Sequence, residues 1–213
     1  MVTRVVEVPP DRLVGWVQRY RGTHPESVLS AADGGLLLSG PPGVSATLQP
    51  LHKFVPGPEV ASDDLAPALA AHAAAPAVTA VLLLRRGGYA VGVATGAELV
   101  HSKVGGRYVQ SRTAAGGWSQ QRFARRRAGQ VQQLVRAAAQ AWAAFPKDPR
   151  PTVLVTGGDR ALCDELLQEP ALTAVRGLGT DRHLDVPDPR LEVLRQAARR
   201  AHAIVATVVE PEG

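Results

Sequence analysis

The sequence predicts an α/β protein in which a mixed sheet with helices on both faces follows a small α+β unit. Three observations predict this class. Three strand-like runs with very short links are followed by alternating helix-like and strand-like segments, and a proline-rich stretch precedes them. Hydrophobic residues make up 45% of the 213 residues. That share is enough for a buried core and excludes a largely disordered chain.

The first unit is expected over residues 1–57. It opens with a valine-rich run, Val2–Val8, that is typical of a strand. Asp33-Gly34-Gly35 between two apolar runs predicts a hairpin turn. Three prolines within residues 50–58 indicate a linker, so we place the boundary near Pro58. A short helix after Pro10 is predicted by apolar residues at i, i+3, i+4 and i+7, namely Leu13, Trp16, Val17 and Tyr20.

The second unit, residues 58–213, begins with a helix of about a dozen residues that Ser62 or Asp63 caps. Strand-like runs follow over residues 78–85, 88–95 and 98–104, and links this short require antiparallel neighbours. The segments that complete the pattern are a long helix over roughly 119–145, a strand over 152–156, a helix to about 168, a short strand near 172–178 and a helix from 189 to about 205. The order β-β-β-α-β-α-β-α is that of ribonuclease H-like folds.

Folds with this order often carry two-metal nucleases, whose chemistry needs several carboxylates on the first strand and its neighbours. The corresponding strand here, residues 80–85, contains no acid. The six histidines are not spaced i, i+2 or i, i+4, and the single cysteine, Cys163, excludes a cysteine-rich zinc site and an internal disulfide. We therefore expect neither a metal nor a cofactor.

Membrane and secretory signals are also missing from the sequence. No apolar stretch approaches the roughly 18 residues of a membrane span, and the N-terminus lacks the apolar core of a signal peptide. We expect a cytoplasmic protein that makes no membrane contact and acts as a monomer.

Positive charge is concentrated in one stretch. Residues 99–147 hold nine of the 24 Lys and Arg residues and none of the 19 Asp and Glu residues. Such a segment is typical of a surface that binds a polyanion. The simpler alternative is a solvated basic face beside a flexible loop.

Four of these cations, Arg122, Arg125, Arg126 and Arg127, fall in the first turns of the long helix, which Ser119 can cap. A cation at a helix N-terminus opposes the helix dipole, with a cost on the usual scale of about 0.3–1 kcal/mol. A phosphate backbone would supply the missing counter-charge, so the arrangement favours RNA binding over stability.

Residues 116–127 read Gly-Gly-Trp-Ser-Gln-Gln-Arg-Phe-Ala-Arg-Arg-Arg. This segment resembles the catalytic loop of the eukaryotic and archaeal class 1 release factors, in which Gly-Gly-Gln-Ser and two further residues precede Arg-Phe-Ala-Arg-x-Arg. It is more similar still to the actinobacterial branch of the Vms-like release factors (VLRF), and the order of elements extends the resemblance over about residues 62–205. Trp118 stands where the release factors have glutamine. Vms-like factors displace the glutamine similarly, so we assign its role to Gln120, with Gln121 second.

The resemblance implies a peptidyl-tRNA hydrolase that acts on P-site peptidyl-tRNA at the large ribosomal subunit. Its catalytic residues would be Gly116, Gly117, Gln120 and Gln121. A glutamine amide has no useful pKa, so it would position a water molecule and not act as a general base. Trp118 would stack on a base or, equally well, anchor the loop by packing. The residues implied in RNA binding are Arg107, Arg112, Trp118, Arg122, Arg125, Arg126 and Arg127.

Two other functions remain open at this point: a non-catalytic RNA- or ribosome-binding module, and an endonuclease that cuts the tRNA 3′ end during ribosome rescue. Gly157-Gly158-Asp159 follows a strand and opens a helix, where phosphates can bind, but it lacks a dinucleotide-binding pattern. We expect a turn capped by Asp159. We expect Cys163 in the core and His101 as a solvated strand residue.

Overall fold

The structure, a computed structural model, describes residues 1–106, 118–178 and 182–212, with the backbone alone over residues 118–128. The chain forms two compact units, Met1–Pro76 with Arg199–Gly213, and Ala77–Ala198. The boundary expected near Pro58 therefore falls inside the first unit. The helix that follows Pro58 belongs to the core of that unit, and the last strand of the chain belongs to its sheet.

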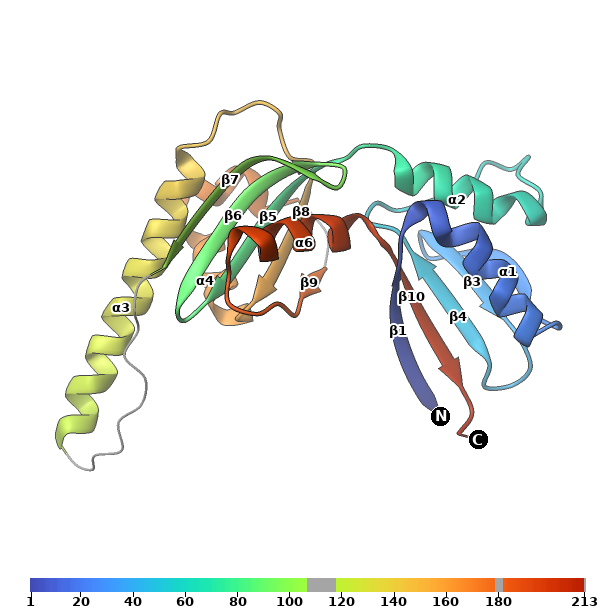
Figure 1. The fold of residues 1–213 in the computed structure, drawn as a ribbon, viewed down its shortest axis with the longest axis horizontal. Coiled ribbons are helices and arrows are strands. Elements are labelled where there is room, and N and C mark those ends of the chain that lie inside the picture. The colour runs from blue at the N-terminus through green and yellow to red at the C-terminus, as the bar shows by residue number, and fades with distance from the viewer. Residues whose placement is uncertain (107–117, 179–181, 213) are drawn as a thin grey trace. The chain divides into compact units, whose positions relative to one another are not determined.

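The first unit is an antiparallel five-stranded sheet in the order β1-β10-β4-β3-β2, with helices packed on one face (Figure 1). Both residues at the tip of the predicted β2–β3 hairpin have positive φ, 43° at Asp33 and 77° at Gly34, as the tight primed turns of hairpins require. The elements of this unit are β1 (Val2–Val8), the short 3₁₀ helix η1 (Pro10–Arg12), α1 (Leu13–Thr23), β2 (Val28–Ala32), β3 (Gly35–Ser39), β4 (Ser45–Gln49), η2 (Ser62–Asp64), α2 (Leu65–Ala74) and β10 (Ile204–Glu210).

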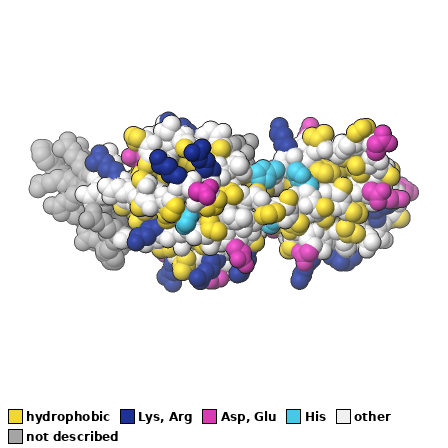
Figure 2. All heavy atoms as spheres, turned by 90° about the horizontal axis from the view of Figure 1, so that it is seen from above, with side chains coloured by type: hydrophobic (Ala, Val, Ile, Leu, Met, Phe, Trp, Pro, Cys, Tyr) yellow, Lys and Arg dark blue, Asp and Glu magenta, His cyan; other side chains and the backbone are white. Residues whose placement is uncertain are grey.

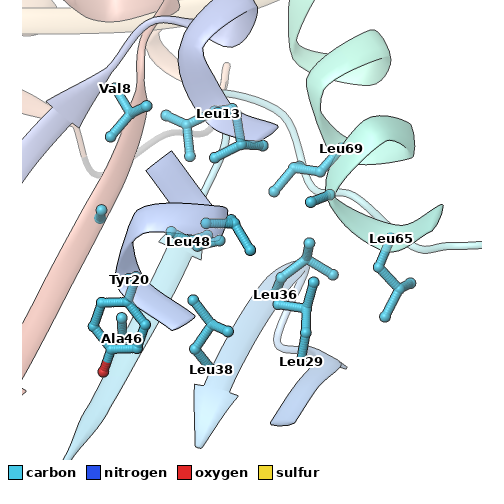
Figure 3. Packing of buried hydrophobic residues seen from close by; sticks show 14 of the residues in the cluster. Val8, Leu13, Tyr20, Leu29, Leu36, Leu38, Ala46, Leu48, Leu65 and Leu69 are labelled. Carbon is cyan, nitrogen blue, oxygen red and sulfur yellow. The ribbon is translucent and has the colours of Figure 1, made fainter. Parts of the chain in front are cut away.

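The core of this unit lies between the sheet and the two helices (Figure 3). Leu13 from α1 and Leu69 from α2 are fully buried against leucines of the sheet. The alternation of β10, in which every second residue is buried, adds Ile204, Ala206 and Val208 to the same face. The N-terminal and C-terminal segments of the chain are thus joined in one hydrophobic core.

The second unit is a mixed five-stranded sheet in the order β7-β6-β5-β8-β9. β5, β6 and β7 form the predicted antiparallel meander, whereas β8 pairs parallel with β5 and β9 parallel with β8. The elements are β5 (Val78–Arg85), β6 (Gly88–Thr95), β7 (Glu98–Gly106), α3 (Trp118–Ala143), β8 (Val153–Gly158), α4 (Arg160–Gln168), η3 (Pro170–Leu172), α5 (Thr173–Arg176), β9 (His183–Leu184) and α6 (Leu191–His202).

Helices cover both faces of this sheet, as predicted (Figure 1). α3 and α4 pack on the face formed by residues such as Leu82 and Val91. α6 lies on the other face, where the side chain of Leu194 approaches Gly92 so closely that a Cβ there would stand 3.1 Å from it. The sheet is therefore buried on both sides, which explains why β5 is apolar along nearly its whole length.

The structure differs from the prediction in three segments. The last helix ends at His202 and not near residue 205, because Ile204–Glu210 pairs with β1 and β4 as a strand. The short strand expected near residues 172–178 is a helical turn, η3 with α5, and β9 follows at His183–Leu184. β4 was not predicted; its alternation of Ser45, Thr47 and Gln49 with buried Ala46 and Leu48 is a strand pattern.

Candidate functional site

Residues 118–127 of the motif form the start of the longest helix in the described part of the chain. α3 begins at Trp118, one residue before the predicted start, so Gln120 and Gln121 fall in its first turn. The four arginines Arg122, Arg125, Arg126 and Arg127 fall in its first three turns. Arg107, Arg112, Gly116 and Gly117 lie outside the described residues.

Strand β7 leads toward this segment along one edge of the sheet. It ends in Gly105-Gly106, and the ring of Tyr89 on β6 lies directly over Gly105. A Cβ at residue 105 would stand 2.5 Å from Cζ of Tyr89, closer than any side chain tolerates. The first glycine of this pair therefore has a packing role, which the sequence alone does not show.

The C-terminal half of α3 is anchored in the second unit. Leu134, Val135, Ala138 and Ala139 are buried between the sheet and α4. The N-terminal half extends past the sheet (Figure 1). At 1.5 Å per residue, Gln120 stands about 21 Å along the helix axis from Leu134. The sheet thus holds one end of a long helix, and the motif occupies the other.

The described cations of the acid-free stretch are all on the surface. Lys103 on β7, Arg136 on α3 and Lys147 after α3 are exposed. Figure 2, seen from the side of the α3–β8 loop, shows Lys and Arg side chains on this face together with hydrophobic and acidic ones. The described cations of the basic stretch are therefore accessible from solvent.

A family model covers the whole of the second unit and the whole motif. The model described as "Actinobacteria/chloroflexi VLRF1 release factor" matches residues 77–207, which is more than half of the chain. The chain belongs to this VLRF1 release factor family. The match confirms the resemblance stated on residues 116–127.

Solved structures similar to this VLRF1 family member share little sequence with it. "Vms1 mitochondrial localization core" is 10% identical, with a TM-score of 0.42, and the alignment covers 91% of this chain and 81% of that one. The archaeal translation termination factor aRF1 is 13% identical, with a TM-score of 0.42, and the alignment covers 94% of this chain and 64% of that one. This chain thus spans just under two thirds of the aRF1 chain. No curated protein sequence matches it.

The glycine-rich turn after β8 is a capped helix start in this VLRF1 protein. The Leu162 N–H donates to Oδ1 of Asp159 at 3.3 Å, and Asp159 is the N-cap of α4. Its other carboxylate oxygen lies 4.0 Å from Nε of Arg86. The carboxylate already occupies the position that a phosphate would take, so the structure confirms the turn predicted here.

Cys163 is a core residue, as expected from the sequence. Its side chain is 1% exposed, and its thiol lies 3.4 Å from the carbonyl oxygen of Gly157. Burial raises the pKa of the Cys163 thiol to about 11. The thiol is therefore protonated at neutral pH and carries no nucleophilic chemistry.

A cavity at the opposite end of α3 was not found by sequence reasoning. It has a volume of about 510 Å³, and Trp142, Phe145, Lys147 and Arg150 are among the residues that line it. The spacing of Trp142 and Phe145 is that of core residues, which is why the sequence places them in the apolar stripe of the helix. A signal was available, since three prolines, at 146, 149 and 151, alternate with two cations immediately after these aromatics.

Two observations on the described residues concern metal-binding groups and membrane-spanning helices. Among them, no group of three or more His, Cys, Asp and Glu side chains is arranged to hold a metal ion. In the same part of the chain, no helix is both long enough and apolar enough to cross a membrane.

Proposed function

We propose that this protein is a ribosome-associated peptidyl-tRNA hydrolase that releases stalled nascent chains in the cytoplasm. One observation carries the proposal. The Gly-Gly, Gln and Arg-Phe-Ala-Arg motif lies within the region that matches the VLRF1 release factor family, and its residues from Trp118 onward belong to the start of a helix whose C-terminal half is anchored in the second unit. The partners are the large ribosomal subunit and P-site peptidyl-tRNA.

The proposed reaction is hydrolysis of the ester between the nascent peptide and the terminal ribose of the tRNA. Water attacks the ester carbonyl carbon, the C–O bond to the ribose breaks, and a peptide carboxylate and a free ribose hydroxyl result. Gln120 positions this water, because a neutral amide both donates and accepts hydrogen bonds. Backbone N–H groups at Gly116-Gly117 stabilise the oxyanion that develops. Gln121 is the second candidate for the glutamine role.

Seven residues provide the RNA contacts in this proposal. Arginines bind phosphates through paired N–H donors, and Trp118 stacks on a base. Phosphates near the start of α3 also compensate for the cations that the helix dipole disfavours there. These residues are Arg107, Arg112, Trp118, Arg122, Arg125, Arg126 and Arg127.

We further propose that the second unit has a ribonuclease H-like fold. The sheet order β7-β6-β5-β8-β9, with β6 antiparallel to both neighbours and β8 and β9 parallel to β5, supports this assignment. The described residues of its central strand, β5, carry no carboxylate. The fold would therefore serve to position α3 and not to hold catalytic metals.

Peptide release from large subunits that carry P-site peptidyl-tRNA tests the function. We expect Gln120→Ala to lower the release rate about a hundredfold, since it removes a group that positions the reacting atoms. Gln132→Ala is the matched control, because Gln132 is an exposed glutamine on the same helix. Equal release by wild type and Gln120→Ala would remove Gln120 from its role, and no release by wild type would refute the activity.

Analysis of the tRNA product separates hydrolysis from the alternatives. Ester hydrolysis leaves an intact 3′ CCA end, whereas an endonuclease leaves a shortened one. A non-catalytic binding module would bind the subunit and release no peptide. An intact CCA end together with released peptide is the result that we expect.

A further inference from the structure

The cavity at the C-terminal end of α3 has a rigid aromatic wall. Phe145 lies between two rings: the His101 ring stacks on it with centroids 5.8 Å apart, and Trp142 meets it edge-on at 5.7 Å. His101 Nε2 lies 3.4 Å from the carbonyl oxygen of Asp148 and donates to it. The two lining aromatics are half-buried, so each is held by the core and still presents a surface to the cavity.

The structure of strand β7 places His101 against this wall. The β6–β7 pairing shifts register between Val93 and Ala94, so that Val93 pairs with His101. Val93 itself lines the cavity. A β-bulge of this kind re-aims the side chains next to it. The cavity is therefore lined by the end of α3, the segment that follows it, Val93 of β6, and residues of η3 and α5, while His101 of β7 supports Phe145 from behind.

The residues that line the cavity carry positive charge and no negative charge. Lys147 and Arg150 are both exposed on its rim, and no Asp or Glu is among the lining residues. The remaining lining residues are apolar: alanines, valines, three prolines and the aromatic pair. A flat apolar group next to an anion matches this chemistry, because rings stack on aromatics while cations bind phosphate.

The volume of the cavity and its position in the sequence are consistent with a nucleotide as the ligand. The volume of about 510 Å³ lies within the usual range for small-molecule sites. His101, Trp142, Phe145 and Lys147 belong to the same acid-free stretch, residues 99–147, that carries the proposed RNA-binding arginines. The cavity thus continues the charge pattern of the proposed site.

We propose that this cavity binds one unpaired nucleotide of RNA, its base on Trp142 and Phe145 and its phosphate on Lys147 and Arg150. Residue 142 lies about 33 Å along α3 from residue 120. A nucleotide held here would be a second RNA contact, separate from the motif and acting on affinity. The choice of RNA over another polyanion rests on the proposed function, whereas the binding of a nucleotide in the cavity can be tested without it.

Photocrosslinking with a single-stranded RNA that contains 4-thiouridine tests the cavity in the full-length protein. We expect a crosslink within residues 137–147, which include Trp142 and Phe145 and none of the motif residues; in each variant it is mapped by fragmentation of the peptide that holds these two aromatics. The rim variant replaces both rim cations, Lys147→Gln with Arg150→Gln. It should raise the RNA concentration that gives half-maximal crosslinking at least about fivefold. Arg136→Gln with Arg160→Gln is the control, because it removes the same charge from exposed residues outside the cavity.

Four outcomes decide the proposal. A crosslink that needs at least about five times more RNA in the rim variant, but not in the control, supports it. Crosslinks confined to residues 107–127 overturn it, as does an equal effect of the two double variants. Labelling of the peptide that holds Trp142 and Phe145 by a photoreactive acidic peptide but not by RNA also overturns it, in favour of a protein partner.

Peptide release separates this proposal from the proposed function. The rim variant should raise the protein concentration needed for half-maximal release and leave the rate at saturation unchanged. Gln120→Ala should leave the crosslink intact while it removes release. A crosslink without any release by wild type would keep the nucleotide site and refute the hydrolase.

Discussion

At the scale of single residues, the turn between β8 and α4 shows how closely the backbone is packed in the second unit. Gly158 has a φ of +91°, and a Cβ there would stand 2.2 Å from the carbonyl oxygen of Leu84. Asp159 N–H donates to that same carbonyl at 2.7 Å. Only glycine fits this conformation and this approach, because any side chain would collide with the neighbouring strand.

Replacing Gly158 with alanine should therefore be costly. We expect Gly158→Ala to lower the free energy of unfolding by at least about 2 kcal/mol, from the left-handed backbone together with the steric clash. Gly129 is the control: it lies inside α3, and a Cβ added there would meet no described atom within 4 Å apart from its chain neighbours and the backbone of its own helix. Gly129→Ala should raise stability by about 0.5–1 kcal/mol. Urea unfolding midpoints measure both, and equal midpoints for the two variants would contradict the packing argument.

The thiol of Cys163 provides a second test at this scale. With its pKa raised from 9.0 to about 11, the fraction of thiolate at pH 8 is roughly a hundredfold lower than for an ordinary thiol. Because the raised pKa favours the protonated thiol, this contribution to stability is present below pH 9 and is lost as pH rises toward 11.

We expect iodoacetamide to modify Cys163 in the folded protein at pH 8 at least about a hundred times more slowly than in urea. Mass spectrometry of quenched samples measures the rate. As a control, free cysteine under both conditions corrects for the effect of urea on the reagent. Rapid modification of the folded protein would show that α4 does not protect the thiol.

Single-residue features are predictable from the sequence where the cause is local. Asp159 is recognisable as a cap because its residue type and its place after two glycines suffice. The cavity at Trp142 and Phe145 is not, since helical spacing alone does not distinguish a core side chain from one that lines a cavity. Its other walls come from β6 and α5, which are distant in sequence.

At the scale of elements, β10 shows where local pattern fails. Leu191, Leu194, Ala198, Ala201 and Val205 follow helical spacing, which predicts a last helix that extends to about residue 205. The β-branched run that begins at Ile204 instead finds strand partners on both sides, β1 and β4. Pairing with segments about 150 to 200 residues away outweighs local periodicity, and a single sequence does not reveal it.

Removing β10 should unfold the first unit and leave the second folded. A chain that ends at Ala203 loses Ile204, Ala206 and Val208, which are all at most 1% exposed. It also leaves β1 without its strand partner. Hydrogen exchange should then become fast in β1 and β4 and stay slow in β5.

A chain that ends at Glu210 is the control, because it keeps the whole strand and loses only the three residues after it. Slow exchange of β1 and β4 in the shorter chain would show that the first unit does not depend on β10.

At the scale of the whole molecule, the uneven distribution of charge and the family can be predicted from the sequence, whereas the division of the chain into two units cannot. The motif and the acid-free stretch are contiguous in sequence, so they need no knowledge of the fold. The division depends on α2 joining the first core and on the chain's last strand returning to the first sheet. Both depend on packing between segments that are distant in sequence, and the proline-rich stretch before α2 does not predict that packing.

The uneven charge of the molecule leads to a prediction about salt. Each phosphate contact releases bound counterions, so the logarithm of the affinity for single-stranded RNA falls with the logarithm of salt concentration by about 0.7 per contact. If Arg122, Arg125, Arg126 and Arg127 all contact phosphates, changing the four to glutamine should lower this slope by about 3. Titrations of the protein against single-stranded RNA at several salt concentrations measure it.

The control for this prediction separates position from net charge. Arg4, Arg12, Arg136 and Arg160 are exposed and lie outside the motif, so changing them to glutamine removes the same four charges from the net charge of +5. Long-range attraction alone would make the two quadruple variants behave alike. Direct contacts at the start of α3 would lower the salt slope only in the first, and equal slopes would place the RNA-binding surface elsewhere on the protein.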